Sequence, residues 1–183
     1  KMKEGQRWLT ASGHAPMGYG LPGAIGAHYA SGRRVVCITG DGGLQLNLQE
    51  LALVAGNHLP ITIFVLNNDG YLTMKHTQQN HFGRLTGADS ASGLHMPNLR
   101  LLAKAYGIEY ASILDEISSL DIIGALAHKG PMIVEVFMDP MQPLIPRVQT
   151  TKNEDGSLRP GLLEEMYPYL PREEFAANMS ISA

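Results

Sequence analysis

The chain has 183 residues, of which 44% are hydrophobic and 17% are charged, a balance that suits one globular domain with a substantial core. A formal net charge of −3 offers no basic field for a polyanion, so we expect no nucleic-acid partner. No apolar stretch reaches the roughly 18 residues of a membrane span, so we expect no membrane partner. Cys37 is the only cysteine and lies within an apolar run, which predicts a buried thiol and a reducing, cytoplasmic setting.

Helical patterns and short apolar runs alternate along most of the chain. The predicted elements are a helix over 21–30, a strand over 35–39, a helix within 43–56, a strand over 61–66, a helix over 99–106, a strand over 108–113, a helix over 118–128 and a strand over 132–137. The segments over 35–39 and 61–66 are unbroken apolar runs, as in strands buried on both faces of a parallel sheet. The alternation predicts an α/β domain, doubly wound, with a mostly parallel sheet and helices on both faces.

Two segments lack these patterns. Residues 75–96 are too polar and too rich in glycine for one regular element, so we expect a loop. Prolines recur after residue 140, which predicts an extended tail with at most a turn of helix near 162–166. The chain is therefore divided into a domain over 1–140 and a proline-rich tail over 141–183.

Polar residues and glycines follow two of the predicted strands where each ends. These segments are GDGG at 40–43 and NNDG at 67–70. Ligands of open α/β sheets bind at the carboxyl ends of the strands, so we expect both segments to face one crevice. The Asp41 carboxylate, the Asn68 amide oxygen and the backbone carbonyl of Gly70 would supply three oxygen ligands for a magnesium ion.

The first of these segments also suits a phosphate group. Gly42 and Gly43 have no side chains, so the N–H groups that open the next helix at Leu44 can approach a diphosphate closely. No GxxxxGK[ST] motif is present, which excludes a P-loop. The residues therefore predict a site for an anion together with its metal.

GDG at 40–42, followed after 24 residues by Asn67-Asn68, resembles the fingerprint of thiamine diphosphate enzymes, which begins with GDG and ends with NN. The segment MGYGLPGAIG at 17–26 is similar to the one that precedes this fingerprint in acetolactate synthases and their relatives. The resemblance extends from Arg7 to about Phe137, and the tail around 163–168 resembles theirs more loosely.

The resemblance implies a role for each matching residue. Met17 would wedge under the cofactor and impose its bent conformation, and the carbonyl of Ala15 would accept a hydrogen bond from the aminopyrimidine. Magnesium would be held by Asp41, Asn68 and the carbonyl of Gly70. The cofactor-binding residues implied are Ala15, Met17, Asp41, Gly42, Gly43, Asn68, Gly70, Tyr71 and Leu72.

Enzymes of this kind decarboxylate a 2-oxo acid and transfer or release the resulting unit, and the resemblance favours pyruvate. Their catalytic glutamate belongs to a separate pyrimidine-binding domain, which no segment of this chain resembles. We therefore expect a fragment or a split subunit that is inactive alone and is completed by a pyrimidine-binding domain of the same or a neighbouring chain. The whole enzyme would be a homo-oligomer. FAD, where the full-length enzyme binds it, would lie mostly in a middle domain and not in this chain.

Two alternatives stay open. Gly18, Gly20 and Gly23 satisfy the GxGxxG pattern, and Asp41 stands 18 residues beyond Gly23, as in an NAD(P)-binding Rossmann domain. Such a pattern should directly follow an apolar strand, whereas residues 12–16 read SGHAP. The other alternative is a noncatalytic module that keeps the thiamine-binding fold.

The remaining polar candidates carry weaker signals. His14 precedes the predicted pyrimidine contact, so it is a candidate for contact with substrate, with a structural role as the alternative. His76 and His81 fall in the predicted loop, and no motif supports a substrate contact there. Glu50 fits a helix surface or an interface better than a catalytic acid.

Overall fold

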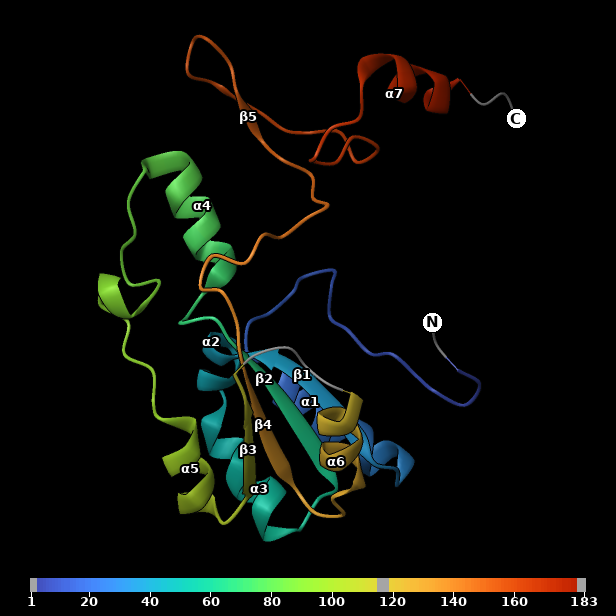
Figure 1. Cartoon of the computed structure of the whole chain (residues 1–183), viewed down its shortest axis with the longest axis vertical. Helices are drawn as coiled ribbons and strands as arrows, with labels where there is room; N and C mark the ends of the chain where they lie inside the picture. Colours follow the sequence, from blue (N-terminus) through green and yellow to red (C-terminus); the bar gives the residue numbers. More distant parts are fainter. Residues whose placement is uncertain (1–2, 115–118, 181–183) are drawn as a thin grey trace. The chain divides into compact units, whose positions relative to one another are not determined.

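The computed structural model describes residues 3–114 and 119–180. The chain divides into two compact units, Lys1–Gln142 and Pro143–Ala183 (Figure 1). The first unit contains a parallel sheet and the hydrophobic core, and the second contains a short hairpin and a helix. None of the described helices is long and apolar enough to span a membrane.

The first unit is built on a four-stranded sheet whose neighbouring strands are all parallel. The order across the sheet is β1 (Val35–Gly40), β2 (Ile61–Asn67), β4 (Met132–Phe137) and β3 (Glu109–Ile113) (Figure 1). Ile61, Ile63 and Val65 are fully buried because β2 lies inside the sheet and its side chains are covered. The four predicted strands are confirmed to within one residue at each end.

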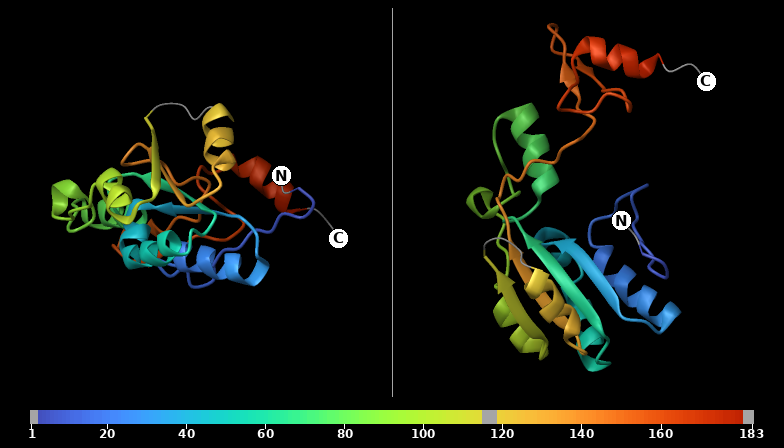
Figure 2. Two further views of the ribbon diagram at one scale, coloured as in Figure 1. Left: turned by 90° about the horizontal axis from the view of Figure 1, so that it is seen from below. Right: turned by 45° about the vertical axis from the view of Figure 1, so that its right-hand side comes forward.

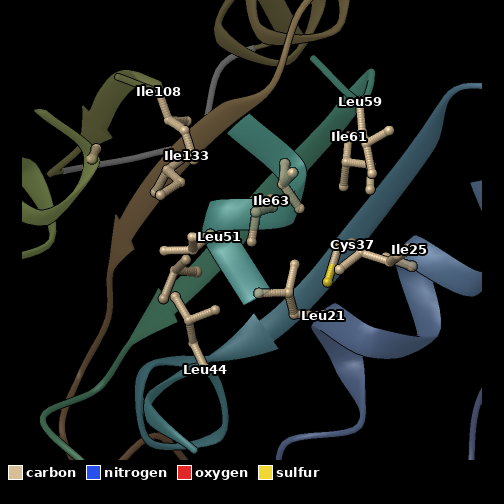
Figure 3. Close-up of a cluster of buried hydrophobic side chains, with 14 of the residues drawn as sticks. Leu21, Ile25, Cys37, Leu44, Leu51, Leu59, Ile61, Ile63, Ile108 and Ile133 are labelled. Atoms are coloured by element: carbon tan, nitrogen blue, oxygen red, sulfur yellow. The ribbon is translucent and has the colours of Figure 1, made fainter. Parts of the chain in front are cut away.

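Helices cover both faces of this sheet, which confirms the doubly wound α/β fold. The helices are α1 (Gly20–Ser31), α3 (Leu51–Gly56) and α5 (Leu99–Tyr106) on one face and α6 (Ser119–Ala127) on the other. Leu21 and Leu51 pack with Ile63 in one cluster (Figure 3), whereas Ala125 packs with Val134 in another. Figure 2 shows α1 and α6 on opposite sides of the sheet. Residue 118, where the last of these helices was predicted to begin, lies outside the described residues.

The single helix predicted within 43–56 is wrong. The segment forms α2 (Asp41–Gln45), a 3-10 turn η1 (Leu48–Glu50) and α3. Asn47 leaves the helical conformation with φ −137° and ψ 35°, and its side-chain Nδ2 donates to the Gly18 carbonyl at 2.9 Å. The leucine spacing remains informative because Leu44 and Leu51 still enter the same core cluster.

The loop predicted over 75–96 is also partly wrong, because the segment begins inside a helix. α4 (Leu72–Phe82) ends at Gly83, whose φ of 64° is left-handed, and a 3-10 turn η2 (Ser90–Ser92) follows. Polar residues dominate α4 and its buried residue is Lys75, so hydrophobic periodicity gives no helical signal. The stretches around η2 are irregular, as predicted.

The second unit has more regular structure than an extended tail. It contains a two-stranded antiparallel hairpin of β5 (Thr151–Lys152) and β6 (Leu158–Arg159), followed by α7 (Arg172–Met179). Near 162–166, where at most a turn of helix was predicted, the Glu165 N–H donates to the Leu162 carbonyl at 3.1 Å in a single turn, and the helix of this unit lies further along the chain. Pro171 precedes α7 and Glu173 and Glu174 occupy its first turn, which are features that favour a helix start.

Candidate functional site

Asp41 and the turn after β2 meet at the carboxyl edge of the sheet. β1 and β2 pair in parallel with Gly40 opposite Leu66, so the residues that follow the two strands emerge together. The Gly70 N–H donates to Asp41 Oδ2 at 2.8 Å, and the Gly42 N–H donates to Asp41 Oδ1 at 2.9 Å. The two predicted strand ends therefore face one site.

Asp41 is a buried carboxyl group with incomplete charge compensation. Its side chain is 3% exposed, and burial raises its pKa, while hydrogen bonds from Gly70 and Gly42 and the charge of Lys75 act in the opposite direction. A buried carboxylate is costly unless it is paired or coordinates a metal. The Asp41 environment is therefore one that a bound cation would stabilise.

The two adjacent asparagines have different environments. The Asn67 side chain donates to Glu135 Oε1 at 2.6 Å and accepts the Asp69 N–H at 3.1 Å, so both of its polar atoms have partners. The Asn68 side chain is 7% exposed, and its Oδ1 has no hydrogen-bond partner among the described residues. A buried amide oxygen without a donor is costly, and a metal ion would remove that cost. The side-chain oxygen of Asn68 is thus unused within the described residues, whereas both polar atoms of Asn67 are used inside the protein.

Glu135 supports this arrangement from inside the sheet. It is the one charged residue of β4 and is buried, and it accepts hydrogen bonds from Asn67 and from the Tyr110 hydroxyl of β3. Burial, followed by the interaction with Glu135, raises the pKa of Tyr110 to about 12, so its hydroxyl keeps the proton that it donates. Sequence analysis missed Glu135, although a lone charge in the run MIVEVF was a usable signal.

Glycine is required at two positions of the site by the protein itself. A Cβ on Gly70 would lie 2.3 Å from the Ala88 carbonyl oxygen, and the φ of 112° at Gly70 disfavours any other residue. A Cβ on Gly42 would lie 2.5 Å from the Tyr71 ring and 3.1 Å from the Gly70 carbonyl oxygen. The Gly70 carbonyl therefore lies directly beside the Asp41-Gly42 segment, where the predicted third magnesium ligand is expected.

Lys75 contacts the site from α4 and was missed because its segment was predicted as a loop. The side chain is completely buried, and Nζ donates to the Asn68 carbonyl at 2.6 Å and to the Asp69 carbonyl at 3.4 Å. Long cationic side chains are rarely buried in this way. No sequence pattern marked Lys75, because its neighbours in α4 are mostly polar.

The predicted pyrimidine-side residues lie in the segment before α1. Met17 is 57% exposed, His14 and Ala15 are exposed, and Ala15 has a left-handed φ of 44°. The hydrogen bond from Asn47 to the Gly18 carbonyl joins this segment to the turn after α2. Within the described residues, no hydrogen bond links His14, Ala15 or Met17 to Asp41.

The residues predicted near the diphosphate lie at the starts of two helices, Gly42 and Gly43 in α2 and Tyr71 and Leu72 at α4. Tyr71 packs against Gly42 and its N–H donates to Ala88 at 2.9 Å, and Leu72 opens the helix. His76, one turn further along, forms a hydrogen bond with the Gln142 carbonyl at 3.0 Å, which is a structural role. His81 is exposed near the end of α4.

The glycines of the GxGxxG pattern serve the packing of α1. A Cβ on Gly20 would lie 3.2 Å from the Thr39 side chain of β1, and one on Gly23 would lie 2.9 Å from the Tyr19 ring. No strand precedes them among the described residues 3–19. A dinucleotide fingerprint needs such a strand, so the Rossmann alternative has no support here.

Comparison with known families agrees with the geometry of the site. Residues 1–136 match the family described as thiamine pyrophosphate enzyme, C-terminal TPP binding domain. The chain therefore belongs to this family.

Curated relatives include several acetolactate synthases. The chain is 38% identical over 135 residues to the acetolactate synthase of Arthrospira platensis, covering 72% of this chain and 23% of the relative. It is 33% identical over 145 residues to the acetolactate synthase isozyme 1 large subunit of Escherichia coli K12, covering 78% of this chain and 25% of the relative. It is 33% identical over 171 residues to the acetolactate synthase large subunit of Cyanidium caldarium, covering 91% of this chain and 28% of the relative. The chain thus spans about a quarter of the length of these relatives.

Proposed function

We propose that this chain is the diphosphate- and magnesium-binding part of a thiamine diphosphate-dependent enzyme. The observation that carries the proposal is the buried Asn68 Oδ1 without a partner, in a turn that also hydrogen-bonds the buried Asp41 carboxylate. In this family such a pair of side chains would bind the cation that accompanies the cofactor. The Gly70 carbonyl, beside Gly42, would be the third protein ligand.

The donor set fits magnesium. A carboxylate, an amide oxygen and a backbone carbonyl are hard oxygen ligands, and magnesium normally completes its octahedron with water and phosphate oxygens. The diphosphate would lie next to Gly42, Gly43, Tyr71 and Leu72, at the start of α2 and α4. The same ion would interact with the negative charges of both the diphosphate and Asp41.

The exposed segment before α1 would take the other end of the cofactor. Met17 would support its bent form from below, and the Ala15 carbonyl would accept a hydrogen bond from the aminopyrimidine. His14 is a candidate for contact with substrate, and its exposure is compatible with that role. Thiamine diphosphate supplies a nucleophilic carbon that adds to the carbonyl of a 2-oxo acid.

The relatives named acetolactate synthase indicate the reaction class. We propose decarboxylation of a 2-oxo acid, with pyruvate favoured, followed by transfer or release of the unit that remains, which is lyase or transferase chemistry. The catalytic glutamate would come from a pyrimidine-binding domain of the same or a neighbouring chain, within a cytoplasmic homo-oligomer. FAD, if the whole enzyme uses it, would bind outside this chain.

Isothermal titration calorimetry tests the cofactor assignment. Thiamine diphosphate should bind when Mg²⁺ is present and lose at least about tenfold in affinity when EDTA removes the metal. NAD, titrated under the same conditions, should not bind. Binding of NAD, or binding of thiamine diphosphate that is indifferent to Mg²⁺, would contradict the assignment.

A turnover assay tests whether the chain needs a pyrimidine-binding domain for activity. The chain with Mg²⁺ and thiamine diphosphate should release no CO2 from pyruvate, because the group that activates the aminopyrimidine is supplied elsewhere. Addition of a pyrimidine-binding domain from an acetolactate synthase that restores CO2 release would support the proposal. Turnover by the chain alone would show that it contains its own catalytic acid.

A further inference from the structure

Lys75 is a buried cation whose contacts are backbone oxygens. Its Nζ donates to the carbonyls of Asn68 and Asp69, and no carboxylate among the described residues lies within 4.0 Å of it. Lys75 lies in the first turn of α4, where its own N–H bonds to the Tyr71 carbonyl at 2.9 Å. The side chain therefore reaches back from the helix to the turn that precedes it.

That turn has a conformation that needs external support. Asp69 has a φ of 60° and Gly70 a φ of 112°, so two successive residues lie in the left-handed half of conformational space. A non-glycine residue there carries a conformational cost that neighbouring contacts must offset. Asn67 binds the Asp69 N–H on one side of the turn, and Lys75 binds the two carbonyls on the other.

The direction of these carbonyls determines which oxygens are left for a ligand. With the Asn68 and Asp69 carbonyls occupied by Lys75, Asn68 Oδ1 has no partner and the Gly70 carbonyl lies beside Gly42. We propose that Lys75 is a positioning residue for the cation, because it holds the Asn68–Gly70 turn in the form that presents these two oxygens next to Asp41. This inference rests on the proposed function.

A purely electrostatic role for Lys75 predicts the opposite effect of its removal on metal affinity. An ammonium group close to a cation site repels the cation, so removal of a merely electrostatic Lys75 would strengthen metal binding. Removal of a positioning Lys75 would leave the buried Asn68 carbonyl and the half-buried Asp69 carbonyl without this donor, release the turn and weaken metal binding. The sign of the change in affinity therefore separates the two roles.

The test compares the wild-type chain with two variants. Lys75→Met has a side chain of similar length but removes the charge and the donors, whereas Lys75→Arg keeps the charge and the donors. Hydrogen exchange of the 67–71 amides in the ligand-free chain reports the order of the turn. Electron paramagnetic resonance with Mn²⁺ as the probe and thiamine diphosphate present reports cation affinity.

For Lys75→Met we expect turn amides to exchange at least about tenfold faster, with β1 and β4 unchanged, and Mn²⁺ to bind at least about tenfold more weakly. Lys75→Arg should recover part of both losses. Unchanged exchange in the turn, or tighter Mn²⁺ binding by the Met variant, would overturn the inference. A variant that is less stable but has wild-type Mn²⁺ affinity would overturn it as well.

Two controls keep the result interpretable. If Lys75→Met does not fold, Lys75→Gln, which retains an N–H donor on a shorter uncharged chain, replaces it with the same expected signs. If the wild-type chain fails to bind Mn²⁺ with thiamine diphosphate, the proposed function fails and the cation role of Lys75 fails with it. The exchange comparison then still decides whether Lys75 orders the turn.

Discussion

Asn67 and Asn68 are chemically identical neighbours whose side chains meet different surroundings. Asn67 links Glu135 of β4 to the Asp69 N–H, whereas Asn68 Oδ1 is buried without a partner among the described residues. A residue pair of this kind separates structural from ligand-binding effects, because the two substitutions remove the same atoms from different contacts.

Alanine at each asparagine should therefore have a different consequence. Asn67→Ala should lower the free energy of unfolding by about 1–3 kcal/mol, because the Glu135 carboxylate and the Asp69 N–H lose a partner. Asn68→Ala should leave stability nearly unchanged and abolish Mg²⁺-dependent binding of thiamine diphosphate. Urea denaturation and calorimetry measure the two effects, and the reverse pattern would contradict the assignment of roles.

Asp41 provides the matching prediction for the charged ligand. Asp41→Asn keeps the size of the side chain and one oxygen acceptor but removes the charge that a cation would compensate. We expect the affinity for Mg²⁺ with thiamine diphosphate to fall by at least about a hundredfold. Stability without metal should change little, because the gain from removing a buried charge is offset by the loss of the acceptor for the Gly42 or the Gly70 N–H. Unchanged affinity in the calorimeter would refute Asp41 as a ligand.

Cys37 is buried as its sequence context predicts, and burial has a pH consequence. Its thiol pKa is raised from 9.0 to about 11 by burial. The unfolded chain therefore loses this proton first, so the contribution of the thiol to stability is complete below pH 9.0 and is lost as the pH rises toward about 11. In Cys37→Ser the decline in stability over this interval, measured by urea denaturation, should be smaller.

At the residue scale, the sequence indicated candidate metal ligands, but it did not indicate the residues that hold those ligands in place. GDG and NN stand out because they occur as a pair at the ends of two successive strands, where open α/β sheets bind ligands. Three supporting residues, Glu135, Asn47 and Lys75, act through contacts that no sequence motif indicates. Asn67 and Glu135, for example, are 68 residues apart in the sequence. Those contacts depend on sheet order and on α4, neither of which a single sequence specified.

At the scale of elements, the connection between β2 and α4 is the most constrained part of the first unit. Gly70 combines a φ of 112° with a backbone contact at Ala88, whereas Gly83 at the end of α4 has a φ of 64° and open space around its missing Cβ. The same substitution at the two glycines compares a crowded position with an open one, both at positive φ.

Gly83→Ala should cost about 1–2 kcal/mol of unfolding free energy, which is the penalty of a left-handed residue. Gly70→Ala should cost more than about 3 kcal/mol, because the new methyl group also collides with the Ala88 carbonyl. Thermal denaturation of both variants provides the measurement. Equal losses would show that the turn yields easily and that the Ala88 contact is not restrictive.

The elements that the sequence predicted well are those whose pattern reports burial directly. β1, β2 and β4 are rich in β-branched residues, so apolar character located them, whereas β3 is more polar and was predicted from its place in the alternation of elements. α4 was missed because its buried side chain is a lysine. The helix expected within 43–56 is interrupted at Asn47, whose side chain donates a hydrogen bond to the Gly18 carbonyl. In both cases a tertiary polar contact overrode the local pattern.

At the scale of the whole molecule, every proposed ligand lies in the first unit. The proposed ligands Asp41, Asn68 and Gly70 and the positioning residue Lys75 all precede Gln142, and the first unit holds the four-stranded parallel sheet. A chain ending at Gln142 should therefore retain Mg²⁺-dependent binding of thiamine diphosphate within about threefold of the full chain. Calorimetry on the shortened chain checks this, and a loss of binding would indicate that Pro143–Ala183 contributes to the site.

The order of the strands also has a consequence for biosynthesis. β4 is the last strand of the sheet to leave the ribosome, yet it inserts between β2 and β3, and its Glu135 orients Asn67. A nascent chain exposed only as far as Pro131 can pair β1 with β2 but lacks the strand whose Glu135 binds Asn67, beside the Asn68–Gly70 turn. Contacts between distant segments form slowly. Capture of the proposed cofactor should consequently follow translation of Phe137.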